Sequence, residues 1–437
     1  MSDSELPFQH PWDEGLLKNY ASVIVGGTPS TGVEEFWDGV IPWMTSGEVH
    51  LQHIYDVPGR ITQKGLQSSN AVLVQPKAVA VALAGQGKTR GTVALTHVPI
   101  CTNQSVALIK LIDSRLDTDF LYQSLIPRYE ELRSRSAGGG RAGLSKTILE
   151  NIPVQVPPLP RQKRIVQVLQ TIDRAIAHTE ALIEKYQKIK AGLMHDLFTR
   201  GIGADGKLRP PREQAPELYQ ETAIGWIPKE WNIKLCQEIF SIDSGITLGA
   251  HRRPKKNPRP YLRVANVFKE KIVIDDINYL EASEQENVKY SLHSEDLLLV
   301  EGHANVQQIG RCGMVKNNAE GMLFQNHLFR LKAIDLSAYF GMYLLNSSVA
   351  RRYWEMNCST SSGLNTINRK MLGNMVLGIP LKKEQSNIER ELYSVSKYIE
   401  REENSMKKLM AQKFGLMHDL LTGKVPVKVE PDEVEHD

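Results

Sequence analysis

The chain has 437 residues, of which 41% are hydrophobic and 24% charged, and its formal net charge is +3. This composition excludes a largely disordered chain and leaves room for two folded domains. No apolar run is long enough to span a bilayer and the first residues show no signal core, so we expect a cytoplasmic protein without membrane segments. The four cysteines form no C-x-x-C pair, which argues against a disulfide framework or a zinc site.

The first predicted elements belong to a mixed domain. Turn residues alternate with aromatic residues over residues 26–47 and predict an exposed, ordered loop region. Runs rich in Val, Ile and Leu, separated by Gly or Pro, then predict strands at residues 78–84, 92–98 and 104–112. Asp117 is a candidate N-cap for an amphipathic helix. Residues 136–143, rich in glycine with Arg141 at their centre, predict a flexible loop.

A long helix follows, and its sequence occurs twice. Residues 161–198 return as residues 384–421 without insertion or deletion, at a constant shift of 223 residues. In both copies apolar residues recur at steps of three and four, which are the a and d positions of a heptad seam. A helix of 38 residues is about 57 Å long, and its natural partner is the other copy. The seam comprises Ile165, Leu169, Ile172, Ile176, Ile183, Tyr186, Leu193 and Leu197, matched by Ile388, Leu392, Val395, Ile399, Met406, Leu409, Leu416 and Leu420.

The repeat predicts the order domain, helix, domain, helix. Residues 201–225 have the glycine, proline and mixed charge of a linker. The second domain repeats the earlier elements, with strands predicted at residues 296–301, 309–315 and 322–331, a helical stretch at 335–356, and residues 358–363 in the place of the glycine loop. We expect a first domain at residues 1–156, a helix at 157–200, the linker at 201–225, a second domain at 226–379, a helix at 380–423 and a disordered acidic tail at 424–437.

One loop resembles a phosphate-binding loop, but only poorly. In residues 82–89, Ala82 occupies the position of the first glycine, where a Cβ obstructs the wrap of the backbone around phosphate. We therefore interpret this stretch as a loop that offers Gln86, Lys88 and Arg90 to an anionic surface.

Histidine motifs in the long helices have a structural explanation. His195-Asp196 and His418-Asp419 are helix neighbours whose side chains point about 100° apart, which favours packing or end-capping over catalysis. His50 and His53 have no third ligand in view, and we interpret their spacing as incidental.

Basic residues gather in both predicted domains. Residues 251–260 contain five of them and no acid, with prolines that hold the run extended. Such a run is usually a solvated loop, but two basic faces on two like domains favour a phosphate backbone as the common partner. The amides of Gln86, Asn305 and Gln307 are candidates for reading base edges, although Asn and Gln are equally common in inert loops. The basic candidates are Arg252, Arg253, Lys255, Lys256 and Arg259 in the second domain, and Arg128, Arg133, Arg135, Arg141 and Lys146 in the first.

Motifs of catalysis are missing from the sequence. It contains no Asn-Pro-Pro-Tyr/Phe tetrapeptide, no G-x-G-x-x-G after a strand, no helicase-type acidic box and no nuclease-type Asp/Glu-x-Lys motif. We find no candidate catalytic residue or metal site, and predict a chain that binds without reacting.

Taken together, these motifs make the chain similar to a known family, the specificity subunits of type I restriction-modification systems. The resemblance covers nearly the whole chain, and the order of domains and helices is more specific than any single motif. In the first half it is carried by Gly26-Gly-Thr-Pro-Ser-Thr31, Ile41-Pro-Trp43, Gly85-Gln-Gly-Lys-Thr-Arg-Gly91, Thr102-Asn-Gln104, Pro157-Pro-Leu-Pro-Arg-Gln-Lys-Arg-Ile165 and Gly192-Leu-Met-His-Asp-Leu197. In the second half it is carried by Trp226-Ile-Pro-Lys-Glu-Trp231, Gln325-Asn-His327 and Gly415-Leu-Met-His-Asp-Leu-Leu-Thr-Gly-Lys424.

The resemblance implies an α+β fold: two α/β target-recognition domains separated by two long antiparallel helices that form a coiled coil, with a pseudo-twofold internal repeat. Each domain would read one half of a split site in double-stranded DNA. Two methyltransferase subunits and, through them, motor-nuclease subunits would join the chain. S-adenosylmethionine, ATP and Mg²⁺ would belong to those partners, leaving no cofactor in this chain. Residues 380–385 lack the second proline pair found at residues 157–160, so the start of the second helix stays open.

Two other functions remain open from the residues alone. The helices could space two protein-binding domains in a scaffold that never meets DNA. The chain could also be a stand-alone transcription regulator that needs no methyltransferase. The bases that are read cannot be carried over from the family, because its recognition domains vary freely.

Overall fold

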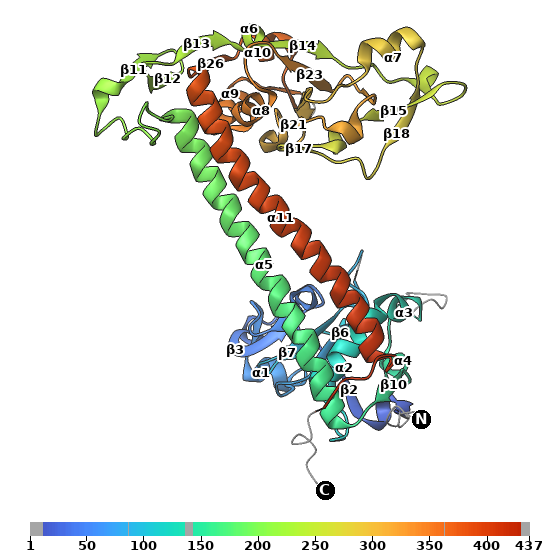
Figure 1. The fold of residues 1–437 in the computed structure, drawn as a ribbon. Helices are drawn as coiled ribbons and strands as arrows, with labels where there is room; N and C mark the ends of the chain where they lie inside the picture. Colours follow the sequence, from blue (N-terminus) through green and yellow to red (C-terminus); the bar gives the residue numbers. More distant parts are fainter. Residues whose placement is uncertain (1–11, 86, 136–142, 362, 430–437) are drawn as a thin grey trace, which may run out of the picture. The chain divides into compact units, whose positions relative to one another are not determined.

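The structure, a computed structural model, describes residues 12–85, 87–135, 143–361 and 363–429. It divides into two compact units: unit 1 comprises residues 1–180 and 404–437, and unit 2 comprises residues 181–403. The boundaries cut the long helices α5 (Leu159–Thr199) and α11 (Lys382–Leu421) at positions that are 223 residues apart. Each unit therefore holds one domain and a part of each long helix (Figure 1).

The main sheet of unit 1 has five strands in the order β2-β9-β6-β7-β4. The central strand β6 reads Val-Ala-Val-Ala and is buried at every position, which explains why it is a continuous apolar run. A three-stranded sheet, β5-β3-β8, and the pair β1-β10 complete the domain. The strands are β1 (Asp13–Leu16), β2 (Ala21–Val25), β3 (Trp37–Met44), β4 (His53–Ile54), β5 (Arg60–Ile61), β6 (Val79–Ala82), β7 (Val93–Thr96), β8 (Cys101–Thr102), β9 (Val106–Leu111) and β10 (Pro153–Val156).

Unit 2 repeats this topology. Its main sheet, β14-β23-β19-β21, corresponds to β2-β9-β6-β7, and its sheet β18-β15-β22 corresponds to β5-β3-β8. The pairs β3-β8 and β15-β22 are both parallel, so the correspondence extends to strand direction. The strands are β11 (Tyr219–Thr222), β12 (Gly225–Pro228), β13 (Asn232–Leu235), β14 (Phe240–Ser244), β15 (Pro258–Leu262), β16 (Val267–Phe268), β17 (Lys271–Ile272), β18 (Asn278–Glu281), β19 (Leu297–Val300), β20 (Gly302–His303), β21 (Cys312–Met314), β22 (Leu323–Phe324), β23 (Leu328–Ala333), β24 (Ser359–Ser361), β25 (Leu364–Thr366) and β26 (Val376–Ile379).

The shorter helices pack on the sheets. The predicted N-cap is confirmed: the Asp117 carboxylate accepts the backbone N–H of Phe120 at 2.9 Å at the start of α2. The helical stretch expected at residues 335–356 consists of two helices, because α8 ends at Asn346 and Ser347 caps a new helix, α9, by accepting the N–H of Ala350. The helices are α1 (Gln63–Gln67), α2 (Thr118–Leu125), α3 (Tyr129–Ser134), α4 (Lys146–Glu150), α6 (Cys236–Ile239), α7 (Glu284–Tyr290), α8 (Ala338–Asn346), α9 (Ser348–Asn357) and α10 (Arg369–Gly373).

Within each unit the long helices run antiparallel and share the core of the domain. In unit 1, Ile165 and Leu169 near the start of α5 lie in one hydrophobic core with Leu420 near the end of α11. In unit 2, Leu197 near the end of α5 lies in one core with Ile388 and Leu392 near the start of α11. Every predicted seam position is buried or half-buried. Polar contacts add to the packing, among them the ion pair of Lys413 with Asp173 at 2.6 Å in unit 1.

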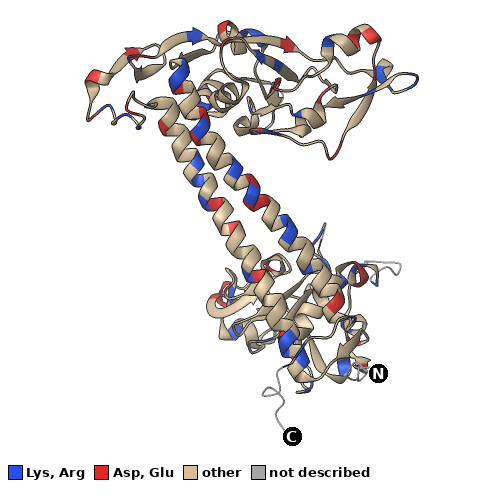
Figure 2. Cartoon of the chain, in the orientation of Figure 1, with Lys and Arg blue, Asp and Glu red and all other residues tan. Residues whose placement is uncertain are grey.

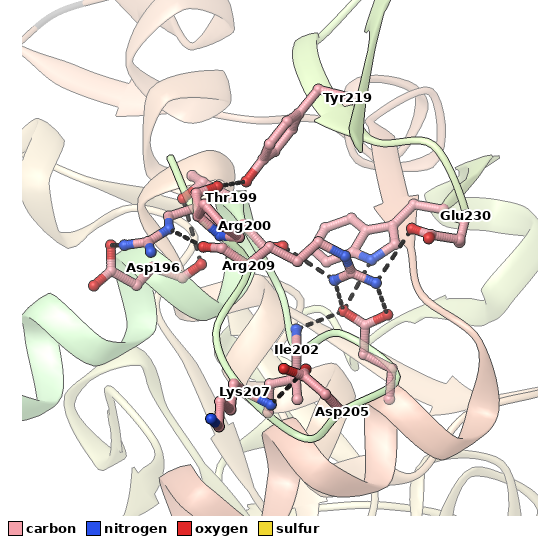
Figure 3. A network of polar contacts seen from close by, with 12 residues as sticks. Asp196, Thr199, Arg200, Ile202, Asp205, Lys207, Arg209, Tyr219 and Glu230 are labelled. Atoms are coloured by element: carbon pink, nitrogen blue, oxygen red, sulfur yellow. Dashed lines mark hydrogen bonds and ion pairs between the residues drawn. The ribbon is translucent and has the colours of Figure 1, made fainter. Parts of the chain in front are cut away.

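Residues 201–225, expected from their composition to be a linker, form ordered structure in unit 2. Arg209, within this stretch, donates two hydrogen bonds of 2.6 and 3.0 Å to the Glu384 carboxylate in the first turn of α11. The same carboxylate accepts the backbone N–H of Ile202 at 2.8 Å and the indole N–H of Trp231 at 3.1 Å. Glu230 adds a second carboxylate 3.2 Å from Arg209 (Figure 3). A buried ion-pair network thus ties the end of α5 to the start of α11 within this unit.

Beyond α11, the first residues of the expected disordered tail are ordered. Gly423 adopts a positive φ of 71° and the N–H of Val425 reaches back to the carbonyl of Asp419 at 3.1 Å, which terminates the helix. Val427 packs against the core of unit 1. The acidic residues 430–437 lie outside the described residues. Among the described helices, none combines the length and apolarity that crossing a membrane requires.

Candidate nucleic-acid interface

Equivalent loops lie together at one end of the strands of the main sheet in each unit. In unit 1 the ends of β2 and β6 lie beside the start of β9, and in unit 2 the ends of β14 and β19 lie beside the start of β23. The chain leaves β2 and β14 through Gly26 and Gly245, where a Cβ would stand 2.0 Å from the Thr102 carbonyl oxygen and 2.3 Å from that of Phe324. Only glycine permits this approach. Each unit therefore presents a rim of loops built in the same way.

In unit 1 this rim includes the loop that resembles a phosphate-binding loop. The Lys88 side chain is exposed, and its carbonyl accepts a hydrogen bond of 2.9 Å from the Tyr129 hydroxyl. Arg133 donates to the Gly87 carbonyl at 2.7 Å and lies over the Tyr129 ring. The loop is thereby fastened to α3, with Arg90 half-exposed beside it. Two further predicted residues, Gln86 and Arg141, lie outside the described residues.

The other basic residues predicted in unit 1 have acidic partners on their own helices. Arg135 lies 2.9 Å from Glu131, and Lys146 lies 3.7 Å from Glu150. Such helix-surface pairs are weak, so both side chains can exchange their partner for a phosphate. Arg128 differs, because it binds Glu131 at 2.6 Å and the Pro153 carbonyl at 2.7 Å and is largely buried. Arg128 therefore stabilises the fold of unit 1.

In unit 2 the basic loop before β15 divides into structural and exposed residues. The Arg252 side chain is only 16% exposed and pairs with Glu286 on α7 at 2.6 Å. The hydrogen bond from Arg252, with a second from the Ser283 backbone, lowers the pKa of Glu286 to about 2. Arg259 pairs with Glu284 at 2.7 Å. Of the five basic residues predicted to face a partner, Arg252 and Arg259 therefore have acidic partners on α7.

The remaining three residues, Arg253, Lys255 and Lys256, are exposed. Their loop is held by Glu281, whose carboxylate accepts the backbone N–H groups of Lys255, Lys256 and Asn257 at 2.8, 3.1 and 2.8 Å. The N–H of Lys255 contributes most to lowering the pKa of the Glu281 carboxyl. Figure 2 shows the basic colour on this projecting loop. Nothing in the local sequence signals Glu281, which lies on β18, 25 residues beyond Lys256.

The amide residues predicted to read bases are engaged within the protein. The Asn305 side-chain oxygen accepts the N–H of Gln307 at 2.9 Å, and the Gln307 amide donates to Glu355 at 2.6 Å. Both residues are exposed, but their side chains shape the loop after β19. Their role in reading bases stays a prediction.

The histidine motifs have structural surroundings. His195 Nδ1 lies 3.2 Å from the Ser348 hydroxyl, and Asp196 pairs with Arg200 at 3.4 Å one helical turn later. His53 Nδ1 lies 3.0 Å from His97 Nε2. Within the described ranges, no three His, Cys, Asp or Glu side chains come together in a group able to hold a metal ion.

Comparison with known proteins gives one family. Residues 10–188 match the family model described as the type I restriction modification DNA specificity domain. The specificity subunit of the type I restriction enzyme MjaVIII from Methanocaldococcus jannaschii is 25% identical over 426 residues, 95% of this chain and 93% of that relative. The specificity subunit of EcoKI from Escherichia coli is also 25% identical, over 80% of this chain and 74% of its own.

Solved structures resemble the fold of the whole chain. The S subunit of a type I restriction-modification system from M. genitalium superposes with a TM-score of 0.54 at 15% identity, covering 96% of this chain and 99% of its own. A chain from a structural study of type I restriction-modification complex assembly gives a TM-score of 0.57 at 14% identity, over 96% of this chain and 100% of its own. At these identities the likeness concerns the fold alone.

Proposed function

We propose that the chain, whose residues 10–188 match the type I restriction modification DNA specificity domain, is the non-catalytic specificity subunit of such a system. Each unit reads one half of a bipartite site in double-stranded DNA. The observation that carries this proposal is the repeat: two units of one topology each present a fastened rim of loops, with exposed basic side chains beside it. A bipartite site on one duplex is suited to such a pair of readers.

The partners follow from the same proposal. A chain that only recognises DNA needs a methyltransferase to act at the site, and two like units offer places for two methyltransferase subunits. Motor-nuclease subunits would join through them. S-adenosylmethionine, ATP and Mg²⁺ would then be bound by these partners.

The function is tested by co-expressing the chain with its methyltransferase and sequencing the methylated adenines of the host DNA. We expect one bipartite motif that appears only when both proteins are present, and specific DNA retardation only by the complex. A scaffold would give no DNA-dependent signal in either assay. A stand-alone regulator would retard DNA equally well without the methyltransferase and would create no methylated motif.

The exposed basic loop gives a quantitative prediction. Replacing Arg253, Lys255 and Lys256 with Ala should flatten the salt dependence of DNA binding by about 0.9 in the log-log slope for each phosphate that the loop no longer neutralises. Arg252 stays in place, because its removal would release the loop from α7. The measurement is the DNA affinity of the complex at a series of salt concentrations.

A control removes the same charge elsewhere in unit 2, at the exposed residues Lys207, Lys229 and Lys234. This control variant should keep the salt dependence of DNA binding that the wild-type complex shows. A loop variant with an unchanged slope would show that the loop touches no phosphate, and an equal change in both variants would point to net charge as the cause.

A further inference from the structure

Two histidines lie on the rim of loops of unit 2. His327 directly precedes β23, and its carbonyl accepts the backbone N–H of Glu301, directly after β19, at 3.1 Å. His303 closes β20, the short strand that follows Glu301. Because β23 lies between β14 and β19 in the sheet, both histidines lie near the middle of the rim.

Each of the two rings is held by a hydrogen bond at its Nδ1 atom. The Nδ1 of His303 lies 3.0 Å from the backbone nitrogen of Asn305, which donates, so this Nδ1 accepts and carries no proton. The Nδ1 of His327 lies 2.9 Å from a carboxylate oxygen of Glu301, which accepts, so this Nδ1 carries the proton. The hydrogen bond at one ring nitrogen determines the protonation of the other. In the neutral rings, His303 therefore carries a proton at Nε2 and His327 carries none there.

The two Nε2 atoms have opposite hydrogen-bonding character and are free to meet a ligand. Neither of them has a hydrogen-bond partner in the part of the chain that the structure describes. The His327 side chain is 56% exposed, and His303 is half-buried. His303 can donate from Nε2 and His327 can accept there. The rim thus presents one donor and one acceptor whose protons are set by the fold.

A donor and an acceptor together match the edge of adenine in the major groove. Adenine offers the acceptor N7 beside the N6 amino donor, whereas guanine offers two acceptors, cytosine an amino donor and thymine an acceptor. Phosphate is a poor ligand for His327, because the adjoining Glu301 carboxylate repels phosphate oxygens. The corresponding segments of unit 1, residues 83–85 after β6 and 103–105 before β9, contain no histidine. This chemistry therefore belongs to unit 2 alone.

We propose that His303 and His327 recognise adenine in the half-site read by unit 2, His303 by donating to N7 and His327 by accepting from the N6 amino group. The Glu301 carboxylate and the Asn305 backbone N–H are positioning groups, which hold the rings and set their protons. The basic loop before β15 would contact phosphates, while the two rings discriminate between bases. This inference rests on the proposed function, since it assigns the reading residues of one unit.

The test replaces each histidine with asparagine in the complex of the chain with its methyltransferase. The asparagine amide has a polar atom in the place of Nδ1 and none in the place of Nε2, so the bond to Asn305 or Glu301 can persist while the outward atom is lost. The control is His293→Asn. His293 is exposed, lies 3.8 Å from the Asp296 carboxylate and precedes β19, at the other end of that strand from the rim.

Two readouts are taken once thermal unfolding has verified that each variant is folded: the methylated motif in cells, and competition in vitro between the matched site and sites with single base changes. We expect His327→Asn to lower the discrimination against guanine roughly tenfold at one A·T pair of a single half-site. His303→Asn should lower the discrimination between adenine and pyrimidines by a similar factor. His327→Gln, whose longer side chain returns an amide to the place of Nε2, should recover part of the loss.

The other half-site and the salt dependence of DNA binding should not change, and the His293→Asn complex should behave as wild type. Folded His327→Asn complexes that keep full discrimination, that relax a G·C pair, or that relax both half-sites together would overturn the inference while leaving the proposed function intact. A wild-type complex that methylates no bipartite motif would instead remove the function on which the inference rests.

Discussion

Replacing Glu384 with Ala is expected to destabilise unit 2 by at most about 3–5 kcal/mol, the usual cost of removing one member of a buried ion pair, since Arg209 keeps the half-exposed Glu230 3.2 Å away. Glu384 is 7% and Arg209 6% exposed, so the guanidinium would stay largely out of water without its bidentate carboxylate. The indole N–H of Trp231 and the backbone N–H of Ile202 lose their acceptor as well. For a unit of this size, thermal unfolding should begin about 10 °C lower.

The matched control is Glu391→Ala, on the same helix, whose carboxylate lies 3.7 Å from Arg390 and is half-exposed. That change should alter stability by less than about 0.5 kcal/mol. Replacing both Arg209 and Glu384 by apolar residues should recover part of the loss, because no buried charge is then left alone. If Glu384→Ala destabilised the protein no more than Glu391→Ala, the network would not be what holds the two helix ends together.

The order of residues 201–225 could not be predicted from the sequence. Residues 201–225 have the glycines, prolines and mixed charges of a linker, and composition alone gives no reason to expect order there. Their order depends on Arg209 meeting Glu384, 175 residues later. A contact between residues so far apart leaves no periodicity or motif in the sequence. The internal repeat offers no hint either, since Arg161 occupies the position of Glu384 in the first copy.

Which basic residues of the loop before β15 are exposed could not be predicted, for a related reason. Five basic residues without a local acid predict a uniformly exposed cationic run, yet Arg252 and Arg259 find Glu286 and Glu284 on α7. The acids stand 34 and 25 positions away, so only the fold reveals which cations are neutralised. The same holds for Asn305, whose side chain caps a turn. The residue types predicted an anionic partner. Tertiary contacts determine which of the polar side chains remain available to bind it.

Local sequence patterns predicted individual helices and strands correctly. Asp117 combines a capping side chain with an amphipathic run, and it caps α2. The buried strands β6 and β19 are short apolar runs bounded by turn residues, which identifies a strand without tertiary information. The long helices were predictable because the same apolar seam occurs in both copies of the repeat. In addition, Pro158 and Gly201 lie just before and after α5.

The distance between half-sites should depend on the length of the two long helices. α5 and α11 each run without interruption through a unit boundary, at Glu180 and Glu403. If the paired helices separate the two readers, the spacer between half-sites depends on helix length and on no side chain that touches DNA. Lengthening both helices at this boundary then changes the spacer while both rims of loops stay intact.

Inserting four residues after Glu180 and four after Glu403 adds about one helical turn, roughly 6 Å, and approximately keeps the packed faces in phase. Because one base pair rises about 3.4 Å, the preferred spacer should lengthen by one to two base pairs while both half-site sequences stay the same. Inserting two residues instead rotates the seam by about 200° and should abolish the pairing of the helices. The measurement is the methylated motif in cells that carry each variant. An active four-residue variant with an unchanged spacer would show that helix length does not determine the distance between the half-sites.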